Sequence, residues 1–235
     1  MIIEGAISVK AAINNHKRII NTVYINKDKK TKDFNYIRKI CKLKNINIVE
    51  SDNDTLNDKA SGKSFGGVLA ETSERQYDDF DDGDIFYLDG IEDPFNLGYA
   101  MRTLYAFGIN NVLLPSRDYS NMESQLLKSS AGAYDMLNIK ITENSLNSIN
   151  ELKNNGYYLY GLYRGDNSKD IFDVKFNKKA LFMLGGEKRG ISSEVLSKCD
   201  EYLYISYGSD FRNSLNACGA LDVVATLLFS QRRKW

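Results

Sequence analysis

The stretch from Asp93 to Arg102, Asp-Pro-Phe-Asn-Leu-Gly-Tyr-Ala-Met-Arg, holds residue types well suited to chemistry. It follows the apolar run Ile85–Leu88, which is typical of a buried strand, and it opens an amphipathic helical segment. Asn96 stands where a helix N-cap is expected, because its side-chain oxygen can accept a hydrogen bond from an unpaired backbone N–H. Arg102 follows six residues later, so we expect it near the strand's carboxyl edge, where open α/β sheets bind ligands. A capped helix with a solvated arginine also explains this stretch.

A second stretch combines the apolar run Ala180–Leu184 with a glycine-rich turn that begins at Gly185. Glycine has no Cβ, so a ligand can approach the backbone closely there, and Glu187 is left at the strand edge. A common glycine turn before a helix capped by Ser192 or Ser193 is the simpler explanation. The turn lacks both G-x-G-x-x-G and the P-loop pattern, which disfavours a nicotinamide or nucleoside triphosphate enzyme.

A third stretch follows the apolar segment that starts at Tyr204. Ser214 can cap the last helix, which places Asn216 in the first turn, where backbone N–H groups are still unpaired. Gly219 costs a helix interior about 1 kcal/mol relative to alanine, so it indicates close packing of another backbone. Capping and helix packing alone would also account for this pattern.

Composition describes an ordinary globular protein of one large or two modest domains, with 235 residues, 43% hydrophobic and 26% charged. No apolar run approaches the roughly 20 residues that span a bilayer, and the N-terminus does not resemble a signal peptide. We therefore expect a cytoplasmic protein with no membrane partner. Cys41, Cys199 and Cys218 are widely spaced and there is one histidine, so neither a disulfide framework nor a metal site is expected.

Charge is distributed unevenly along the chain. Residues 1–70 carry 13 Lys and Arg against 7 Asp and Glu, a net charge of +6, whereas residues 71–84 have a net charge of −6. A basic module favours a polyanion partner, although many lysine-rich surfaces are merely solvated. We therefore divide the chain into a basic domain at 1–75, an acidic linker at 76–84 and a main domain at 85–235.

Helices and strands are expected to alternate in both domains. In the first, we expect helices at 6–20 and 34–43 and strands at 22–25, 46–49 and 66–70, with Ile7, Ala11, Ile13 and Ile19 in the core. In the second, we expect strands at 84–88, 111–114, 137–141, 157–163, 180–184 and 202–205 and a last helix at 214–230. This alternation predicts an α/β fold with a mostly parallel sheet covered on both faces.

The three stretches together resemble the motifs of the SpoU/TrmH family of RNA 2′-O-ribose methyltransferases, in the SPOUT superfamily. The likeness rests on N-x-G-x-x-x-R at Asn96, Gly98 and Arg102, on G-x-E at Gly185 and Glu187, and on S-L-N at Ser214, Leu215 and Asn216. Lys128–Ala133 looks like the small-residue helix found between the first two motifs. The basic module is similar to the family's L30e-like substrate-binding domain.

The resemblance implies an L30e-like α/β N-terminal domain and a SPOUT α/β domain with a parallel-rich sheet and a C-terminal trefoil knot. The knot would build a pocket for S-adenosyl-L-methionine, held by backbone groups at Gly185, Ile205 and Leu215. It also implies a homodimer with the site near the interface. The catalytic set carried over from the motifs is Arg102, Asn96, Glu187, Ser214 and Asn216.

The resemblance gives Arg102 the central role at the ribose hydroxyl. Because an arginine stays protonated, it is a poor general base, and we expect it to stabilise the developing alkoxide and clamp a phosphate. A phosphate or Glu187 would then accept the proton. The sequence departs from the family where Ile205-Ser206-Tyr207 replaces a frequent Ile-Pro-Met, next to the cofactor pocket.

Structured RNA is the expected partner, and the two-domain layout favours ribosomal RNA, 23S rRNA in particular, over tRNA. A tRNA methyltransferase, a base methyltransferase of the same superfamily and a non-catalytic RNA-binding protein remain as alternatives. The basic residues expected to follow RNA phosphates are Lys27, Lys29, Lys30, Lys32, Arg38, Lys39, Lys42 and Lys44.

Overall fold

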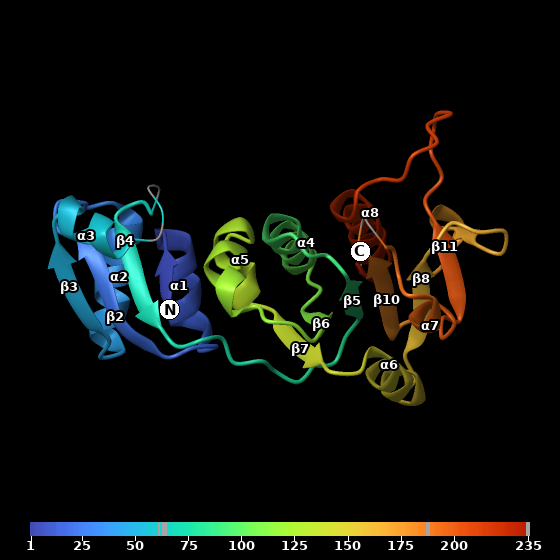
Figure 1. Ribbon diagram of the computed structural model, residues 1–235, viewed down its shortest axis with the longest axis horizontal. Helices are drawn as coiled ribbons and strands as arrows, with labels where there is room; N and C mark the ends of the chain where they lie inside the picture. Colours follow the sequence, from blue (N-terminus) through green and yellow to red (C-terminus); the bar gives the residue numbers. More distant parts are fainter. Residues whose placement is uncertain (61, 63–64, 187–188, 234–235) are drawn as a thin grey trace. The chain divides into compact units, whose positions relative to one another are not determined.

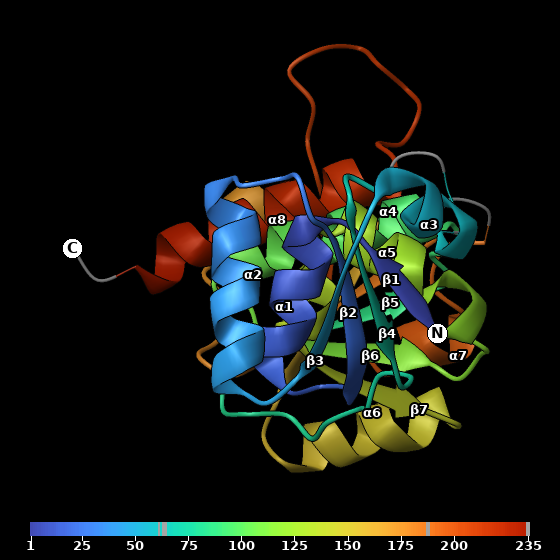
Figure 2. The ribbon, with the colours of Figure 1, turned by 90° about the vertical axis from the view of Figure 1, so that its left-hand side faces the viewer.

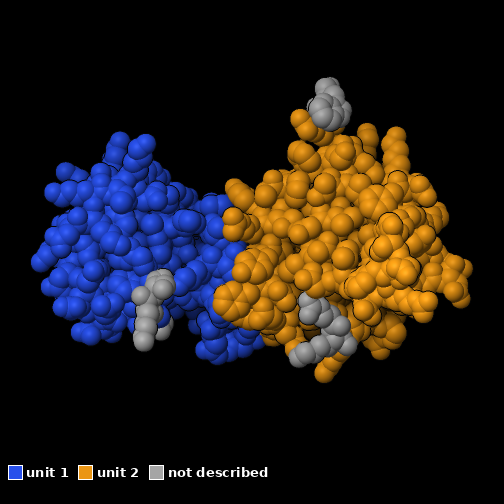
Figure 3. All heavy atoms as spheres, turned by 90° about the horizontal axis from the view of Figure 1, so that it is seen from above, with its two compact units in different colours: residues 1–76, 118–136 blue, residues 77–117, 137–235 orange. Residues whose placement is uncertain are grey.

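The computed structural model describes residues 1–60, 62, 65–186 and 189–233. The chain divides into two compact units, coloured separately in Figure 3. Unit 1 comprises Met1–Gln76 and Asp118–Met136, and unit 2 comprises Tyr77–Arg117 and Leu137–Trp235. The first boundary between the units follows Gln76, one residue beyond the boundary expected after residue 75. Residues 118–136, however, were expected in the main domain and belong to unit 1.

Unit 1 is built on a four-stranded mixed sheet in the order β1-β4-β2-β3 (Figure 2). Its strands are β1 (Ile2–Glu4), β2 (Ile20–Asn26), β3 (Asn47–Ser51) and β4 (Val68–Thr72). Its helices are α1 (Ala6–Asn15), α2 (Lys32–Leu43), α3 (Asn53–Lys59) and α5 (Glu123–Ser129), with 3₁₀ turns η1 (Ser120–Met122) and η2 (Ala133–Asp135). Only β2 and β3 pair in parallel. The sequence patterns predicted neither β1 nor α3.

Helix α1 is shorter than expected. His16 adopts a left-handed conformation with φ of 57° and ends the helix, so Ile19 lies beyond it and is 64% exposed. The buried stripe of α1 includes Ala11 and Ile13, as expected, but leaves Ile7 55% exposed. Two of the four expected core positions were therefore wrong, because the assumed helix was one turn too long and its apolar face slightly rotated.

The small-residue segment before Ala133 is a turn rather than a helix. Helix α5 ends at Ser129, and both Ala131 and Gly132 have positive φ, 51° and 87°. A Cβ on Gly132 would lie 2.6 Å from the Cβ of Ala11, so glycine also permits close packing on α1. The expected helix over Lys128–Ala133 is thus corrected to the end of α5 followed by a tight turn.

A buried ionic cluster holds the two segments of unit 1 together. The Arg18 guanidinium donates to both carboxylate oxygens of Asp135, at 2.9 Å each, and to Glu123 at 2.8 Å. Nε of Arg75 donates to the Tyr134 carbonyl and lies 3.8 Å from Asp135. The four ionic side chains are at most 2% exposed. Burial lowers the pKa of Arg18, but hydrogen bonds and charges of Asp135 and Glu123 outweigh burial and raise it.

Unit 2 contains a seven-stranded sheet in which every pair of neighbours is parallel, as the alternation predicted (Figure 1). The strand order is β7-β6-β5-β10-β8-β11-β9. The strands are β5 (Ile85–Asp89), β6 (Asn111–Pro115), β7 (Asn138–Thr142), β8 (Tyr158–Leu162), β9 (Lys169–Asp170), β10 (Ala180–Gly185) and β11 (Glu201–Tyr204). Six were expected within a residue or two, and only the two-residue β9 was missed.

Helices cover both faces of this sheet. They are α4 (Pro94–Ala106), α6 (Ser145–Asn154), α7 (Ser193–Leu196) and α8 (Ala217–Arg232), with the 3₁₀ turn η3 (Ile171–Asp173). Ile149 of α6 and Val195 of α7 pack in one core cluster with Tyr87 of β5. Successive strand residues point to opposite faces, so Phe86 points to the other face, where it stacks on Phe182.

The acidic segment 76–84 is tied to unit 2 after its first residue. The backbone N–H of Asp78 donates to the carbonyl of Ile139, and that of Asp81 donates to Asn111. Asp84 accepts from the Arg232 guanidinium at 2.8 and 2.9 Å. The expected linker of mutually repelling charges is therefore anchored by backbone hydrogen bonds and one bidentate ion pair.

Two further observations concern membrane spans and metal sites. No helix in the described ranges is both long and apolar enough to cross a membrane. Within the same residues, no three His, Cys, Asp or Glu side chains gather in a way that could hold a metal ion.

The ionic cluster of unit 1 predicts a large stability loss when one partner is removed. Arg18→Met should lower the free energy of unfolding by about 3–5 kcal/mol, because Asp135 and Glu123 would stay buried without their cation. Lys10→Met is the control, since Lys10 and Asp33 form a surface pair at 2.6 Å and should contribute about 1 kcal/mol or less. Urea unfolding measures both, and equal small losses would contradict the prediction.

Candidate active site

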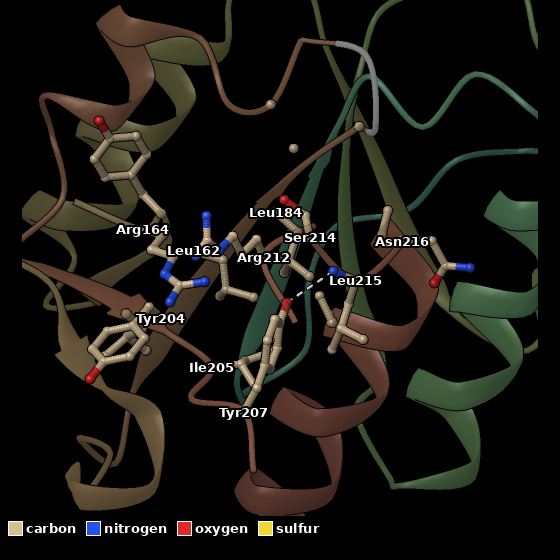
Figure 4. A pocket seen from close by; sticks show the side chains of 17 residues that line it. Leu162, Arg164, Leu184, Tyr204, Ile205, Tyr207, Arg212, Ser214, Leu215 and Asn216 are labelled. Carbon is tan, nitrogen blue, oxygen red and sulfur yellow. Dashed lines mark hydrogen bonds between the residues drawn. The ribbon is translucent and has the colours of Figure 1, made fainter. Parts of the chain in front are cut away.

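A pocket of about 650 Å³ opens at the carboxyl ends of β8, β10 and β11 (Figure 4). Its lining comes from four segments: Leu162, Tyr163 and Arg164; Leu184, Gly185, Gly186 and Gly190; Leu203, Tyr204, Ile205 and Tyr207; and Arg212, Ser214, Leu215, Asn216, Ala217 and Ala220. Parallel sheets bind ligands at this edge, because the loops that follow the strands meet there. The pocket is therefore the candidate active site.

Two glycines at the end of β10 let three backbone segments meet beside the pocket. A Cβ on Gly185 would lie 1.9 Å from the carbonyl carbon of Gly190, and one on Gly186 would lie 2.0 Å from the oxygen of Gly90. Gly186 N–H donates to the carbonyl of Asp89 at 2.5 Å. The sequence predicted that these glycines would let a ligand approach the backbone closely. In the structure, the protein's own backbone already comes that close. Glu187, expected beside this turn, lies outside the described residues.

The segment that leads into α8 carries three of the expected site residues. Ser214, Leu215 and Asn216 all line the pocket, and the Leu215 N–H donates to the Tyr207 hydroxyl at 3.0 Å. The N-cap of α8 is Asn216, whose side-chain oxygen accepts from Gly219 N–H at 2.7 Å, so Ser214 does not cap the helix. The nearest atom to a Cβ on Gly219 would be that same oxygen, and no backbone atom of another element among the described residues lies within 4 Å of it.

The expected cap at Asn96 is also corrected. Asp93 caps α4, because its side chain accepts from the backbone N–H groups of Phe95 and Asn96, and Pro94 occupies the first helical position. Asn96 is half-buried within the first turn, and its carbonyl accepts from Cys218 Sγ at 3.2 Å. Asn96 is not among the pocket-lining residues.

Arg102 lies in the middle of α4 rather than at the sheet edge. Helices α4 and α8 run side by side in the same direction, since Asn96 contacts Cys218 near one end and the rings of Phe107 and Phe229 lie 5.5 Å apart near the other. Arg102 is six residues beyond Asn96, roughly 9 Å along the axis. It is exposed, does not line the pocket and has no hydrogen bond or ion pair with any described residue.

Cysteine chemistry is disfavoured at Cys41 and Cys199. Burial raises the pKa of Cys41 to about 11 and that of Cys199 to about 12. Both therefore stay protonated near neutral pH and lack the thiolate that a nucleophile needs.

Sequence reasoning missed the side chains that follow β8 and those in the loop before α8. Tyr163 and Arg164 reach the pocket because β8 lies between β10 and β11, and Arg212 reaches it from the loop. Strand order determines which loops meet, and no residue pattern in the sequence reports that order. Tyr207 stood in the sequence as a departure from the family pattern, which was the one available signal.

The fold defines a class of protein, namely an α/β protein with a ligand pocket at the edge of a parallel sheet. Residues 84–226 match the SpoU rRNA Methylase family, and residues 2–78 match a family described as RNA 2′-O ribose methyltransferase substrate binding. A Staphylococcus saprophyticus protein named a TrmH family tRNA/rRNA methyltransferase is 32% identical, covering 99% of this chain and 96% of that relative. The chain belongs to the SpoU rRNA methylase family, as its motifs predicted, and by family it is an RNA methyltransferase.

Solved structures share the fold at low sequence identity. The SpoU methyltransferase AviRb from Streptomyces viridochromogenes, in complex with AdoMet, is 18% identical with a TM-score of 0.77, covering 99% of this chain and 90% of that one. An AdoMet-bound rRNA methyltransferase from Sinorhizobium meliloti is 16% identical with a TM-score of 0.80, covering 99% and 88%. These likenesses confirm a SpoU-type α/β fold with a parallel-rich sheet.

The crowding at Gly185 predicts that one methyl group is not tolerated there. Gly185→Ala should lower the free energy of unfolding by about 1–3 kcal/mol, because the backbone at Gly190 must move to make room. Gly208→Ala is the control in the same unit, since nothing lies within 4 Å of its added Cβ, and should change stability by about 0.5 kcal/mol or less. Urea unfolding that showed equal effects would contradict this account of the turn.

Proposed function

We propose that this chain transfers a methyl group from S-adenosyl-L-methionine to a ribose 2′-OH of structured RNA. The observation that carries the proposal is the convergence of five expected site residues, Gly185, Ile205, Ser214, Leu215 and Asn216, in one pocket at the carboxyl edge of the sheet. The family uses this cofactor. Methyl transfer to an RNA base and RNA binding without catalysis are the alternatives.

The pocket suits the cofactor in size and chemistry. Its volume of about 650 Å³ lies in the range of small-molecule sites. Leu184, Leu203 and Leu215 offer apolar walls to a flat ring, while the backbone that follows β10 and β11 offers hydrogen-bonding edges. We assign the backbone groups of Gly185, Ile205 and Leu215 to cofactor binding.

When bound, the cofactor supplies an electrophilic methyl group, and the chain must prepare the ribose hydroxyl. We assign Arg102 to the developing alkoxide and the adjacent phosphate, because a guanidinium stabilises negative charge and does not lose its own proton. Ser214 and Asn216 shape the pocket beside the reacting atoms. We assign Asn96 to the catalytic set together with Arg102, which lies further along the same helix, α4. Glu187 or a phosphate accepts the proton.

A homodimer would place Arg102 near an interface between two copies of the chain. Phe95 and Tyr99 are 47% and 49% exposed on α4, and with Arg102 they follow the i, i+4, i+7 spacing of one helix face. A second copy packed on this face would bury both rings and enclose Arg102 near the interface. We therefore propose a homodimer, which sedimentation equilibrium measures directly.

Several finer features belong to the same proposal. We propose an L30e-like substrate domain at 1–75, a linker at 76–84 and a methyltransferase domain at 85–235, whose residues 118–136 pack within unit 1. The C-terminal segment is proposed to be threaded as a trefoil knot. In support, α8 packs against α4 and β10, so the chain returns across β8 after leaving β11. We propose a cytoplasmic enzyme that acts on rRNA, with tRNA as the second candidate.

Isotope-labelled methyl transfer tests the function. Purified chain is incubated with labelled S-adenosyl-L-methionine and, separately, with unmodified 23S rRNA or tRNA, and the product is digested to nucleosides for mass spectrometry. A 2′-O-methylated nucleoside supports the proposal, and the RNA that yields it decides the substrate. A base-methylated nucleoside, or cofactor binding with no transfer to either RNA, overturns it.

Arg102→Ala should reduce methyl transfer by about 100-fold or more, because the alkoxide loses its charged donor. Cofactor affinity should stay within about twofold of wild type, since Arg102 does not line the pocket. Calorimetry and single-turnover rates separate the two effects. Arg233→Ala, another exposed arginine of unit 2, is the control and should keep the wild-type rate. Near-normal turnover of Arg102→Ala would exclude the assigned role.

The basic residues of unit 1 divide into two sets. Arg38 donates to Glu50 at 2.6 Å and to the carbonyls of Lys29 and Asn26, and Lys44 donates to the carbonyl of Ile13. Their charges are therefore partly committed to the fold. Lys32, Lys39 and Lys42 are exposed along α2 and have no ion pair with any described residue, so we assign phosphate binding to this helix.

Charge reversal on α2 tests that assignment. Lys39→Glu with Lys42→Glu should weaken binding of an rRNA fragment roughly tenfold at moderate salt and reduce the salt slope by about 2. Lys175→Glu with Lys178→Glu is the control, because these exposed lysines of unit 2 change net charge equally. Binding is measured by fluorescence anisotropy across several salt concentrations. Equal losses in both pairs would mean that only net charge matters.

A further inference from the structure

Two aromatic-arginine dipeptides stand at the pocket. Tyr163-Arg164 follows β8, and Phe211-Arg212 lies in the loop between β11 and α8. The rings of Tyr163 and Phe211 are 50% and 52% exposed, although large rings normally avoid water. Tyr163, Arg164 and Arg212 line the pocket. We call these four residues the rim.

The Tyr163 side of the rim is fixed to the sheet. Tyr163 N–H donates to the Leu203 carbonyl at 2.9 Å, which extends the pairing of β8 with β11 by one residue. Ser168 Oγ donates to the Tyr163 carbonyl at 2.7 Å and accepts from Gly165 N–H at 3.0 Å. The turn that presents Arg164 is therefore closed by the side chain of Ser168. It leaves the Arg164 guanidinium at the solvent side of the pocket.

Tyr207 joins the two sides of the rim. Its ring centroid lies 5.7 Å from the Arg164 guanidinium carbon and 6.1 Å from the ring of Phe211. Its hydroxyl accepts from Leu215 N–H, which closes the loop that carries Arg212 (Figure 4). Tyr207 is thus a positioning residue, and Ser206-Tyr207 occupies the place where the family often has Pro-Met.

Both rim guanidiniums lack a carboxylate partner among the described residues. Arg164 and Arg212 lie on one side of the pocket, with Leu215 and Asn216 on the other (Figure 4). A rim built to bind a metal ion would carry acids, and one built for a buried apolar group would not expose two arginines. Fixed guanidiniums beside exposed rings fit a phosphate next to a flat base.

We infer that the rim binds an unpaired nucleotide of the RNA, with a ring stacked on the base and Arg164 and Arg212 on flanking phosphates. A base inside a duplex already stacks on its neighbours and offers no face to Tyr163 or Phe211, so the substrate segment is single-stranded where it is modified. The inference rests on the proposed function for the reaction, but rim binding can be measured without it.

The test compares two RNA probes on the full-length chain. One is a mixed-sequence single-stranded 12-mer, and the other is the same strand annealed to its complement. Arg164→Gln with Arg212→Gln should reduce the salt slope for the single strand by about 1.4, since each phosphate contact on single strands contributes about 0.7. Phe211→Ala should weaken single-strand binding roughly tenfold. Duplex binding should change by less than twofold.

Matched controls exist in the same unit. Phe172 is 54% exposed and does not line the pocket, and the Arg233 guanidinium lies 5.8 Å from the ring of Phe229, much as Arg164 lies over Tyr207. Phe172→Ala and Arg233→Gln should leave single-strand affinity within twofold of wild type. Rim variants that behave like these controls overturn the inference, as do equal losses on duplex and single strand.

Calorimetry with S-adenosylhomocysteine separates the rim from the cofactor site. Rim variants should keep its affinity within about threefold of wild type, because we assign cofactor binding to the backbone of Gly185, Ile205 and Leu215 and not to the rim side chains. A larger loss would assign the arginines to the cofactor and overturn the inference. If wild-type chain binds no cofactor while the rim variants still lose single-strand affinity, the proposed function fails and the rim stands. If the wild-type chain binds the cofactor and the rim variants bind single-stranded RNA as well as their controls do, the inference about the rim is overturned and the proposed function stands.

Discussion

The pocket depends on a steric constraint at the end of β10, where no Cβ can be accommodated. Strand β10 lies between β5 and β8, so its carboxyl end is where loops from both neighbours converge. Gly185 and Gly186 let the backbones at Gly190 and Gly90 approach to distances that any side chain would prevent. Backbone amides and carbonyls rather than side chains therefore form this part of the pocket, which suits recognition of a small ring by hydrogen-bonding edges.

Periodicity predicted the sheet of unit 2 well, because each strand is a short buried run such as Phe86 to Leu88 and is bounded by turn residues. It could not predict that 118–136 would join unit 1. That outcome depends on Arg18 and Arg75 finding Glu123 and Asp135 across long sequence separations. Isolated charged residues look the same in a sequence whether they are solvated or form a buried cluster. The sequence therefore could not predict that 118–136 pack within unit 1.

The two misplaced N-caps show a different limit. Both helices offered several capping residues within a few positions, and chemistry alone ranks Asp, Asn and Ser almost equally. Pro94 was the sequence signal for a cap at Asp93, since proline prefers the first helical position. At α8 the choice fell on Asn216, whose oxygen reaches Gly219 N–H, which leaves Ser214 uncommitted and lining the pocket. The structure brings Ser214, Leu215 and Asn216 to one pocket, but which of them caps the helix could be read only from coordinates.

The positions of the arginines imply that they have different roles. Arg164 and Arg212 stand at the pocket, held by a closed turn and by Tyr207, and such fixed cations suit a ground-state contact with phosphate. Arg102 is exposed on α4, does not line the pocket and has no partner among the described residues. A residue that stabilises only the transition state gains from this separation, because it adds nothing to the binding of substrate or cofactor before the hydroxyl develops charge. In the role proposed for it, Arg102 acts only if a second copy or the bound RNA brings it to the ribose, so the proposed dimer would then be a condition for catalysis.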